Sequence, residues 1–211
     1  MKRNLAGFEI VAGIFAITAL LLVASAAYLG YTVAPSPYPT SSFYAPAITA
    51  NGAGALVKFT ISLKTGNGRT LVNVQNALYQ EDSESALLKA KLNAEKILGL
   101  KLTYYDVILD INAAGADVGG ESAGALFAAG IVSAYTGKAI KRDVAISAGL
   151  NSDGSLFPVE GIEEKILAAK QAGRKKFIVA QGQLIPNQTQ ISEIEIIRLQ
   201  NIEEALSQLL S

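Results

Sequence analysis

Three kinds of hydrophobic pattern follow one another along this chain. An uncharged apolar run extends from Ile10 to Ala34. The next stretch, to about residue 53, mixes small, proline and hydroxyl residues without any periodicity. Beyond it, period-two and period-3.6 patterns alternate up to Ser211. The three patterns predict an apolar anchor, a linker and one folded domain.

The N-terminal run is long enough to cross a membrane. About 25 apolar residues would form a helix of about 37 Å, and a hydrocarbon core is about 30 Å thick. Lys2 and Arg3 favour a cytoplasmic N-terminus, so the domain would lie outside the cytoplasm of a single-pass protein of the cell membrane. Two alternatives stay open: a signal peptide cleaved near Ala24–Ala26, which would release a secreted protein, and a buried soluble helix.

We expect residues 35–53 to be a linker and residues 54–211 to be the folded domain, after an anchor at residues 1–34. Four of the six prolines fall in the linker, and proline-rich segments of this kind are extended and semi-rigid. No charged residue occurs between Glu9 and Lys58. The segment therefore predicts a spacer that adds nothing to a core.

Strands and helices alternate in the domain, which predicts a mixed α/β fold in a single unit. A strand at Val57–Leu63, the turn residues Gly66–Gly68 and a strand at Thr70–Val74 predict a hairpin. The other expected strands are Tyr105–Ile111, Asp143–Ser147, Leu156–Val159, Lys176–Ala180 and Ile194–Leu199. One helix is expected to start at Asp82 or Ser83 and to end at Gly99. Three more are expected at Ser122–Tyr135, Ile162–Ala172 and Ile202–Leu210.

Composition excludes several classes of chemistry. The chain has no histidine and no cysteine, so a serine–histidine pair, a thiol nucleophile and thiolate metal sites are all ruled out. Formal net charge is zero and no basic stripe stands out, so nucleic acid is not an expected partner. We expect neither a metal nor a cofactor. A serine activated by a lysine is the nucleophile that this composition leaves open.

Ser122 is the candidate nucleophile. It lies in the pentapeptide Gly120–Gly124, with Glu121 and Ala123 beside it, at the head of a helix without charge until Lys138. Free backbone N–H groups and the positive end of the helix dipole would surround a serine there, and glycines let backbone approach closely. The pentapeptide fits G-x-S-x-G, but α/β-hydrolases with that motif require a histidine. A serine that only caps the helix is the alternative interpretation.

Lys165 is the candidate base. The helical pattern places it beside the apolar stripe of Ile162, Ile166 and Ala169. Burial of an amine disfavours its charged form, which lowers its pKa toward the value that a general base needs. The alternative is a lysine whose stem is buried and whose ammonium reaches water.

Together these residues resemble the proteolytic domain of Lon proteases, a Ser–Lys peptidase family. The motifs are Ser122-Ala123-Gly124, Thr136-Gly137, Arg142-Asp143-Val144-Ala145, Gly154 to Gly161, and Lys165-Ile166-Leu167-Ala168-Ala169, with an ungapped interval between serine and lysine. Bacterial Lon proteases usually have a proline just before the serine. Glu121 at this position is more similar to the acidic residue of membrane-bound archaeal Lon. It would pair with Lys165 in a resting state, or face solvent.

The resemblance implies a serine endopeptidase with Ser122 and Lys165 as its catalytic dyad and Gly120, Glu121 and Ala123 as supporting residues. Ser147 stands where the family usually has a threonine near the lysine. Its hydroxyl would hold the Lys165 amine toward Ser122, or, as the alternative, would only bind backbone. Homo-oligomers, with a hexameric ring as the expected form, are implied too. The 211 residues contain no Walker motif, so we expect ATP-independent cleavage of unfolded or peptide substrates. The alternative function is an inactive binding or assembly module tethered to the membrane.

Overall fold

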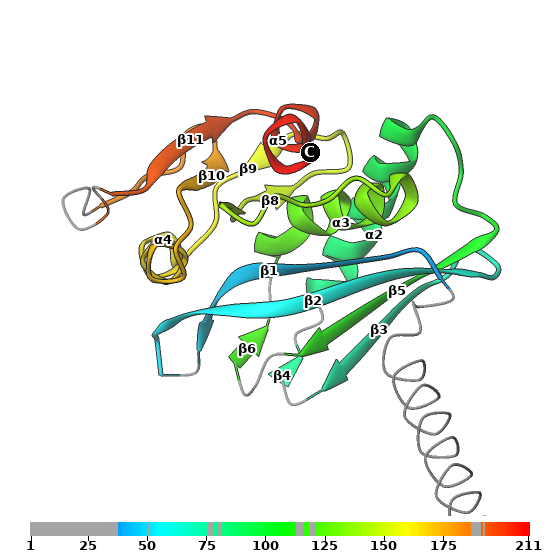
Figure 1. The fold of residues 1–211 in the computed structure, drawn as a ribbon, viewed down its shortest axis with the longest axis horizontal. Helices are drawn as coiled ribbons and strands as arrows, with labels where there is room; N and C mark the ends of the chain where they lie inside the picture. Colours follow the sequence, from blue (N-terminus) through cyan, green and yellow to red (C-terminus); the bar gives the residue numbers. More distant parts are fainter. Residues whose placement is uncertain are drawn as a thin grey trace, which may run out of the picture. The chain divides into compact units, whose positions relative to one another are not determined.

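Figure 1 shows the fold of the chain in a computed structural model. It describes residues 38–49, 51–75, 78–79, 82–112, 116–118, 121–186, 191 and 193–211. The expected anchor at residues 1–34 and the first residues of the expected linker lie outside these ranges. Within them, no helix combines the length and the apolar character needed to cross a bilayer. The mixed α/β fold is confirmed.

A six-stranded sheet forms the base of the domain. Its order is β3-β5-β2-β1-β6-β4, in which β3 is parallel to β5 while β2 is antiparallel to both β5 and β1. Alternate residues of the central strands are buried, as the period-two pattern of Val57–Leu63 predicted. The strands are β1 (Thr40–Thr49), β2 (Gly54–Thr65), β3 (Thr70–Gln75), β4 (Leu78–Tyr79), β5 (Tyr105–Asn112) and β6 (Ala116–Val118).

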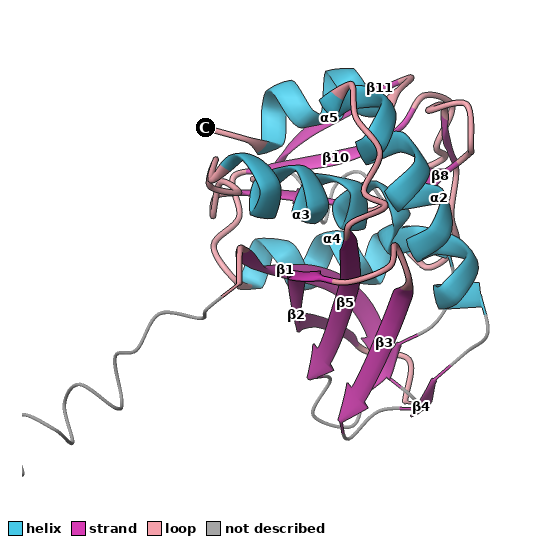
Figure 2. Cartoon of the chain, turned by 90° about the vertical axis from the view of Figure 1, so that its right-hand side faces the viewer, coloured by secondary structure: helices cyan, strands magenta, loops and turns pink. Residues whose placement is uncertain are grey.

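The helices α2 (Asp82–Leu98) and α3 (Gly124–Thr136) cover one side of this sheet (Figure 2), and α4 (Ile162–Gln171) also packs on β1 and β2. α2 ends at Gly99, and α3 ends at Gly137, whose φ of 75° is the left-handed conformation of a helix C-terminus. Every residue of α3 from Gly124 to Ala134 is buried, because α3 packs on α2 and also on β1 and β2. The uncharged composition of α3 therefore reflects burial on all sides.

A smaller sheet belongs to the second half of the domain. Three parallel strands are ordered β11-β10-β7, and a short antiparallel pair β8-β9 lies beside them. The helix α4 follows β9 and leads into β10 (Figure 1). The elements are β7 (Val144–Ile146), β8 (Gly149–Leu150), β9 (Leu156–Phe157), α4 (Ile162–Gln171), β10 (Lys176–Ala180), β11 (Glu195–Leu199) and α5 (Ile202–Leu209).

The expected linker boundary at residue 53 is wrong, because residues 40–49 form β1. This strand pairs with β2 from Thr40 to Ile48, and Asn51-Gly52 makes the turn between them, with Gly52 at a φ of 82°. An Asn-Gly pair between two strands is a hairpin signal that the proline content obscured. Pro46 is tolerated because, among the described residues, β6 pairs with Ile48 and Thr49 and no strand pairs with Pro46 on that side, which places Pro46 at an edge.

The hairpin expected between Val57–Leu63 and Thr70–Val74 is also wrong, although both strands exist. β5 lies between them in the sheet. The loop before β3 wraps around Asp106 of β5: the backbone N–H groups of Asn67 and Arg69 donate to its Oδ1 at 2.9 and 3.0 Å. The Arg69 side chain donates to Oδ2 and holds the pKa of Asp106 well below its usual range. The loop thus carries β3 across to the far edge of β5.

Replacing Phe43 tests whether β1 belongs to the core. Its ring is buried and occupies the space where a Cβ on Gly130 would lie 2.3 Å from Phe43 Cε1. Phe43→Ala is expected to lower the free energy of unfolding by about 3–5 kcal/mol, as for other core phenylalanines. Tyr44→Ala, on the opposite face of β1 and 50% exposed, is the matched control and should change it by about 1 kcal/mol or less, since its ring loses only the contact with the Arg174 guanidinium. Urea unfolding of the full chain measures both, and equal effects would show that β1 is not part of the core.

Candidate active site

Ser122 lies in a short 3₁₀ turn, η1 (Glu121–Ala123), immediately before α3. The N-terminal capping position of α3 is taken by Ala123, and no side chain caps it. The interpretation of Ser122 as a capping serine is therefore wrong, and the expected helix starts two residues later than predicted. The Ser122 side chain is partly exposed, and its Oγ makes no hydrogen bond to the residues that the structure describes. Gly120 lies outside those residues.

The segment after β7 runs alongside the turn of Ser122. The backbone N–H of Ala148 donates to the Ser122 carbonyl at 3.1 Å, and Ser147 N–H donates to Ile178 of β10 at 3.1 Å. Ser147 is 1% exposed, yet its Oγ has no hydrogen-bond partner among the described residues. A buried hydroxyl without a partner costs about 1–3 kcal/mol, so it is a feature that needs a reason. The alternative that Ser147 Oγ simply binds backbone is not observed.

Lys165 is buried in the first turns of α4. It is 7% exposed and lies on the same face as Ile162, Ile166 and Ala169, as the helical pattern predicted. Its Nζ donates to the Glu160 carbonyl at 3.1 Å, and no carboxylate of the described residues forms an ion pair with it. The interpretation of a lysine whose ammonium reaches open water does not fit this burial.

The surroundings of Lys165 favour the neutral amine. Burial lowers the pKa of Lys165 below its ordinary value, because the charged form loses its hydration. The charges of Glu160 and Glu164 act in the opposite direction but are weaker. The neutral amine is the form that can accept a proton from a nucleophile.

The chain topology gathers these three residues at one end of the small sheet. β7 and β10 are parallel, and α4 leads back into β10, so the first turn of α4 lies at the carboxyl end of both strands. Ser147 directly follows β7, and its neighbour Ala148 binds the backbone of Ser122. Ala145 of β7 packs against the apolar face of α4. Ligand sites of parallel sheets form at this edge.

Glu121 forms an ion pair with Lys89 of α2, which is neither of the two alternatives considered for it, a pair with Lys165 or a side chain that only faces solvent. Their side chains are 31% and 26% exposed, which places the pair partly inside the protein. Lys89 was not predicted, because it is 32 residues away in sequence and lies on a helix whose apolar pattern explains only its inner face. Ala123 packs against the main core beside this pair. The turn of Ser122 is thus held by α2 on one side and by Ala148 on the other.

The fold and these side chains define a class of protein. A partly exposed serine hydroxyl, a buried amine of lowered pKa and a chain without imidazole or thiol are typical of serine hydrolases that use lysine as the base.

Comparison with known proteins identifies the family. Residues 47–211 match the family described as Lon protease (S16) C-terminal proteolytic domain, and the chain belongs to this family of serine peptidases. It is 28% identical over 176 residues to Lon protease 2 of Bacillus subtilis, covering 78% of this chain and 32% of that protein. The Lon protease of Flavobacterium johnsoniae is 33% identical over 151 residues, 70% of this chain and 16% of that protein. The archaeal Lon protease of Archaeoglobus fulgidus is 27% identical over 158 residues, 74% of this chain and 25% of that protein. The chain spans about a third or less of the length of these relatives.

Proposed function

We propose that this protein is a membrane-anchored endopeptidase that cleaves unfolded polypeptides with Ser122 as nucleophile and Lys165 as base, without ATP. The observation that carries the proposal is the buried Lys165 amine with a lowered pKa, at the strand edge where the turn of Ser122 meets Ser147. A lysine buried without an ion pair destabilises a fold, so its presence calls for a chemical role.

The first half-reaction forms an acyl-enzyme. Neutral Lys165 takes the proton of the Ser122 hydroxyl as Oγ attacks the carbonyl carbon of the scissile peptide. Backbone N–H groups at the start of α3, which have no partners within the helix, stabilise the oxyanion. The resulting ammonium of Lys165 gives its proton to the leaving amine, and the C–N bond breaks.

The second half-reaction reverses these roles with water. Lys165 takes a proton from a water molecule that attacks the acyl carbon, and then returns a proton to Ser122 Oγ as the ester bond breaks. Ser147 Oγ holds the Lys165 amine during both steps. In the structure Ser147 Oγ bonds neither Lys165 nor any other described residue, and Lys165 Nζ donates to the Glu160 carbonyl. The role therefore requires the amine to turn from that carbonyl to the Ser147 hydroxyl, which no other described group engages.

Ser147 is expected to separate activity from stability. Ser147→Ala should lower kcat about 10- to 100-fold, since a misplaced amine of the base costs rate, while the free energy of unfolding stays equal or rises. Ser147→Thr keeps a hydroxyl at the same position and should retain activity. Steady-state kinetics and urea unfolding of the full chain measure both effects. An Ala variant as active as the wild type would remove Ser147 from the mechanism.

Lys89 is expected to act as a positioning residue through Glu121. Lys89→Met should lower kcat about 10-fold, because the turn that carries Ser122 loses one of its two supports. Glu121→Gln should have a similar effect, and the double variant should be no worse than either single variant. Lys101→Met is the control, since Lys101 pairs with Glu95 at 3.0 Å, outside this turn. Additive losses in the double variant would contradict the coupling.

The proposed substrate class can be tested on the full chain in a non-ionic detergent. Fluorescent unfolded casein should be cleaved at equal rates with and without ATP, while a tightly folded protein of similar size should stay intact. Cleavage that requires ATP would overturn the ATP-independent part of the proposal, and no cleavage in either condition would favour the inactive binding module.

The proposed anchor, its orientation and the proposed homo-oligomer need separate experiments. The chain lacks cysteine, so Ser152→Cys, in an exposed turn, gives one thiol for a membrane-impermeant maleimide on whole cells. Labelling without lysis is expected if the domain is extracytoplasmic, and labelling only after lysis would reverse the orientation. Recovery in the soluble fraction would favour the secreted alternative. Light scattering of the purified chain should give a mass above one subunit.

A further inference from the structure

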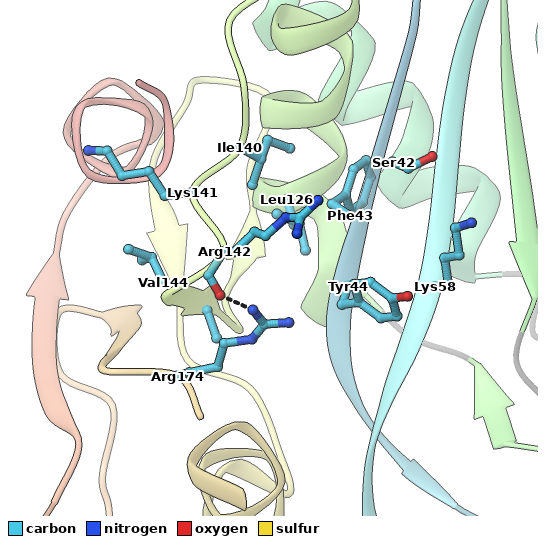
Figure 3. Close-up of a pocket in the computed structure, with 11 residues that line it drawn as sticks. Ser42, Phe43, Tyr44, Lys58, Leu126, Ile140, Lys141, Arg142, Val144 and Arg174 are labelled. Atoms are coloured by element: carbon cyan, nitrogen blue, oxygen red, sulfur yellow. Dashed lines mark hydrogen bonds between the residues drawn. The ribbon is translucent and has the colours of Figure 1, made fainter. Parts of the chain in front are cut away.

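A cavity of about 360 Å³ lies away from the residues assigned to catalysis, between β1 and the segment that leads into β7 (Figure 3). Four cationic residues line it, namely Lys58, Lys141, Arg142 and Arg174, and none of its eleven lining residues is acidic. The chain as a whole carries equal numbers of acidic and basic residues, so this clustering does not follow from composition.

The cations of this cavity are not neutralised within the described part of the chain. None of the four forms an ion pair there. Lys141 donates to the Gln208 carbonyl at 3.0 Å, and its side chain points away from the others (Figure 3). Lys58 and Arg142 are exposed at the cavity. A cluster of like charges costs free energy unless an anion binds between them.

Arg174 is already held in place. Its guanidinium donates to the Arg142 carbonyl and lies over the ring of Tyr44, with Cζ 6.0 Å from the ring centroid. A guanidinium fixed in this way loses little entropy when it binds a carboxylate through two hydrogen bonds. The site is therefore preorganised for an oxyanion.

The cavity also faces a strand edge that is unpaired within the described part of the chain. β1 pairs with β2 on one side, but on the other side the only described partner is β6, which pairs with Ile48 and Thr49. Figure 3 shows Arg142 and Arg174 on the side of β1 that faces away from β2. An unpaired edge beside a pocket for alternate side chains is how extended peptides are bound by strand addition.

We propose that this cavity and the edge of β1 bind an extended, acidic segment of a polypeptide substrate. The proposal rests on the proposed peptidase function and adds a substrate class to it. Val144 lines the cavity and Ser147 lies three residues further along the chain, so about 10 Å of backbone separates the cavity from Ser147 at about 3.3 Å per residue. One extended chain can span that distance. Substrates with glutamate or aspartate beside the cleaved segment should therefore be preferred.

Binding can be measured without cleavage. The full chain carrying Ser122→Ala is titrated into a fluorescent peptide containing several glutamates, and into the same peptide with each glutamate replaced by glutamine. Fluorescence anisotropy should give a Kd at least about tenfold lower for the acidic peptide, because one charge-assisted hydrogen bond is worth about that factor. The difference should shrink as salt is added.

Matched variants locate the site. Arg142→Gln with Arg174→Gln should abolish the preference, while Lys138→Gln with Lys175→Gln, two exposed lysines outside the cavity, should keep it. Arg142→Glu alone repeats the test without changing Arg174, whose loss could disturb folding. The Arg142 side chain makes no hydrogen bond to the described residues, so its replacement should leave the fold intact. Circular dichroism checks the fold of each variant.

Several results would overturn the proposal. Equal affinity for the two peptides, or equal losses in both double variants, would contradict it directly. Displacement of the peptide by submillimolar inorganic phosphate at constant ionic strength would indicate a site for small oxyanions instead. Self-association that the arginine variants abolish would indicate an interface between copies of the chain. Because anisotropy does not depend on catalysis, an inactive chain would leave this test intact. In an active chain, the arginine variants should raise KM for the acidic substrate and not for its glutamine counterpart.

Discussion

Ser122→Ala is expected to lower kcat for casein peptides by at least about 10³-fold, with only residual hydrolysis left. The reason is that the covalent step requires the hydroxyl, whereas substrate binding and the backbone donors at the start of α3 do not. The fold should persist, because Ser122 Oγ makes no hydrogen bond to the described residues and Ala123 already fills the capping position of α3. Initial rates with fluorescent casein, together with circular dichroism of the full chain, measure the two expectations.

The matched control for this change is Ser207→Ala. Ser207 is an exposed serine of α5 whose Oγ donates to the Glu204 carbonyl, so its loss removes a hydroxyl without touching the site. Its rate should equal that of the wild type. If Ser122→Ala retained full activity as well, hydrolysis would have to come from another nucleophile or from a contaminating protease.

Local patterns were enough to predict most of the elements. The sequence predicts α2 and α4 because an apolar stripe ends at a turn residue, as at Gly99 after α2, and it predicts β10 because its residues form a short apolar run. β1 was missed because prolines, small residues and hydroxyl residues dominate its sequence, although Phe43 and Ala45 alternate with exposed neighbours in the structure. Strand propensity is weaker evidence than helix periodicity, since a strand is defined by the partner beside it.

Sheet order could not be predicted in the same way. The turn residues Gly66–Gly68 favour a hairpin, and only the non-local contact of that loop with Asp106 explains why β5 lies between β2 and β3. The ion pair of Lys89 with Glu121 is likewise a contact between residues far apart in the sequence. Contacts between residues more than 30 positions apart leave no periodic signal in one sequence.

The candidate site was more accessible to sequence reasoning than the sheet. Without histidine or cysteine, few side chains could act as a base, and helical spacing alone placed Lys165 on the inner face of α4. The spacing could not show that the Ser147 hydroxyl has no partner among the described residues, or that Ser122 precedes α3 instead of capping it. Both features depend on how β7, β8 and η1 come together.

Lys165→Met is expected to abolish activity and to stabilise the fold. Loss of the base should lower kcat by at least about 10³-fold, as for other catalytic groups that act as a unit. Methionine fills a similar volume without an amine to desolvate, so the free energy of unfolding at pH 7 should rise. Lys138→Met, at an exposed position after α3, should change neither quantity.

The same amine sets two opposite dependences on pH. Because burial lowers the pKa of Lys165 in the folded state, wild-type kcat should rise with pH through a transition below the ordinary lysine value of about 10.4. The unfolded state binds this proton more tightly, so the stability lost to Lys165 is greatest below its folded pKa and disappears as pH rises past about 10.4. The stability advantage of Lys165→Met should therefore shrink over that window, which urea unfolding at several pH values measures. If the gain in unfolding free energy were independent of pH, methionine would act by packing alone. The Lys165 amine would then not have the lowered pKa that the mechanism requires of its base.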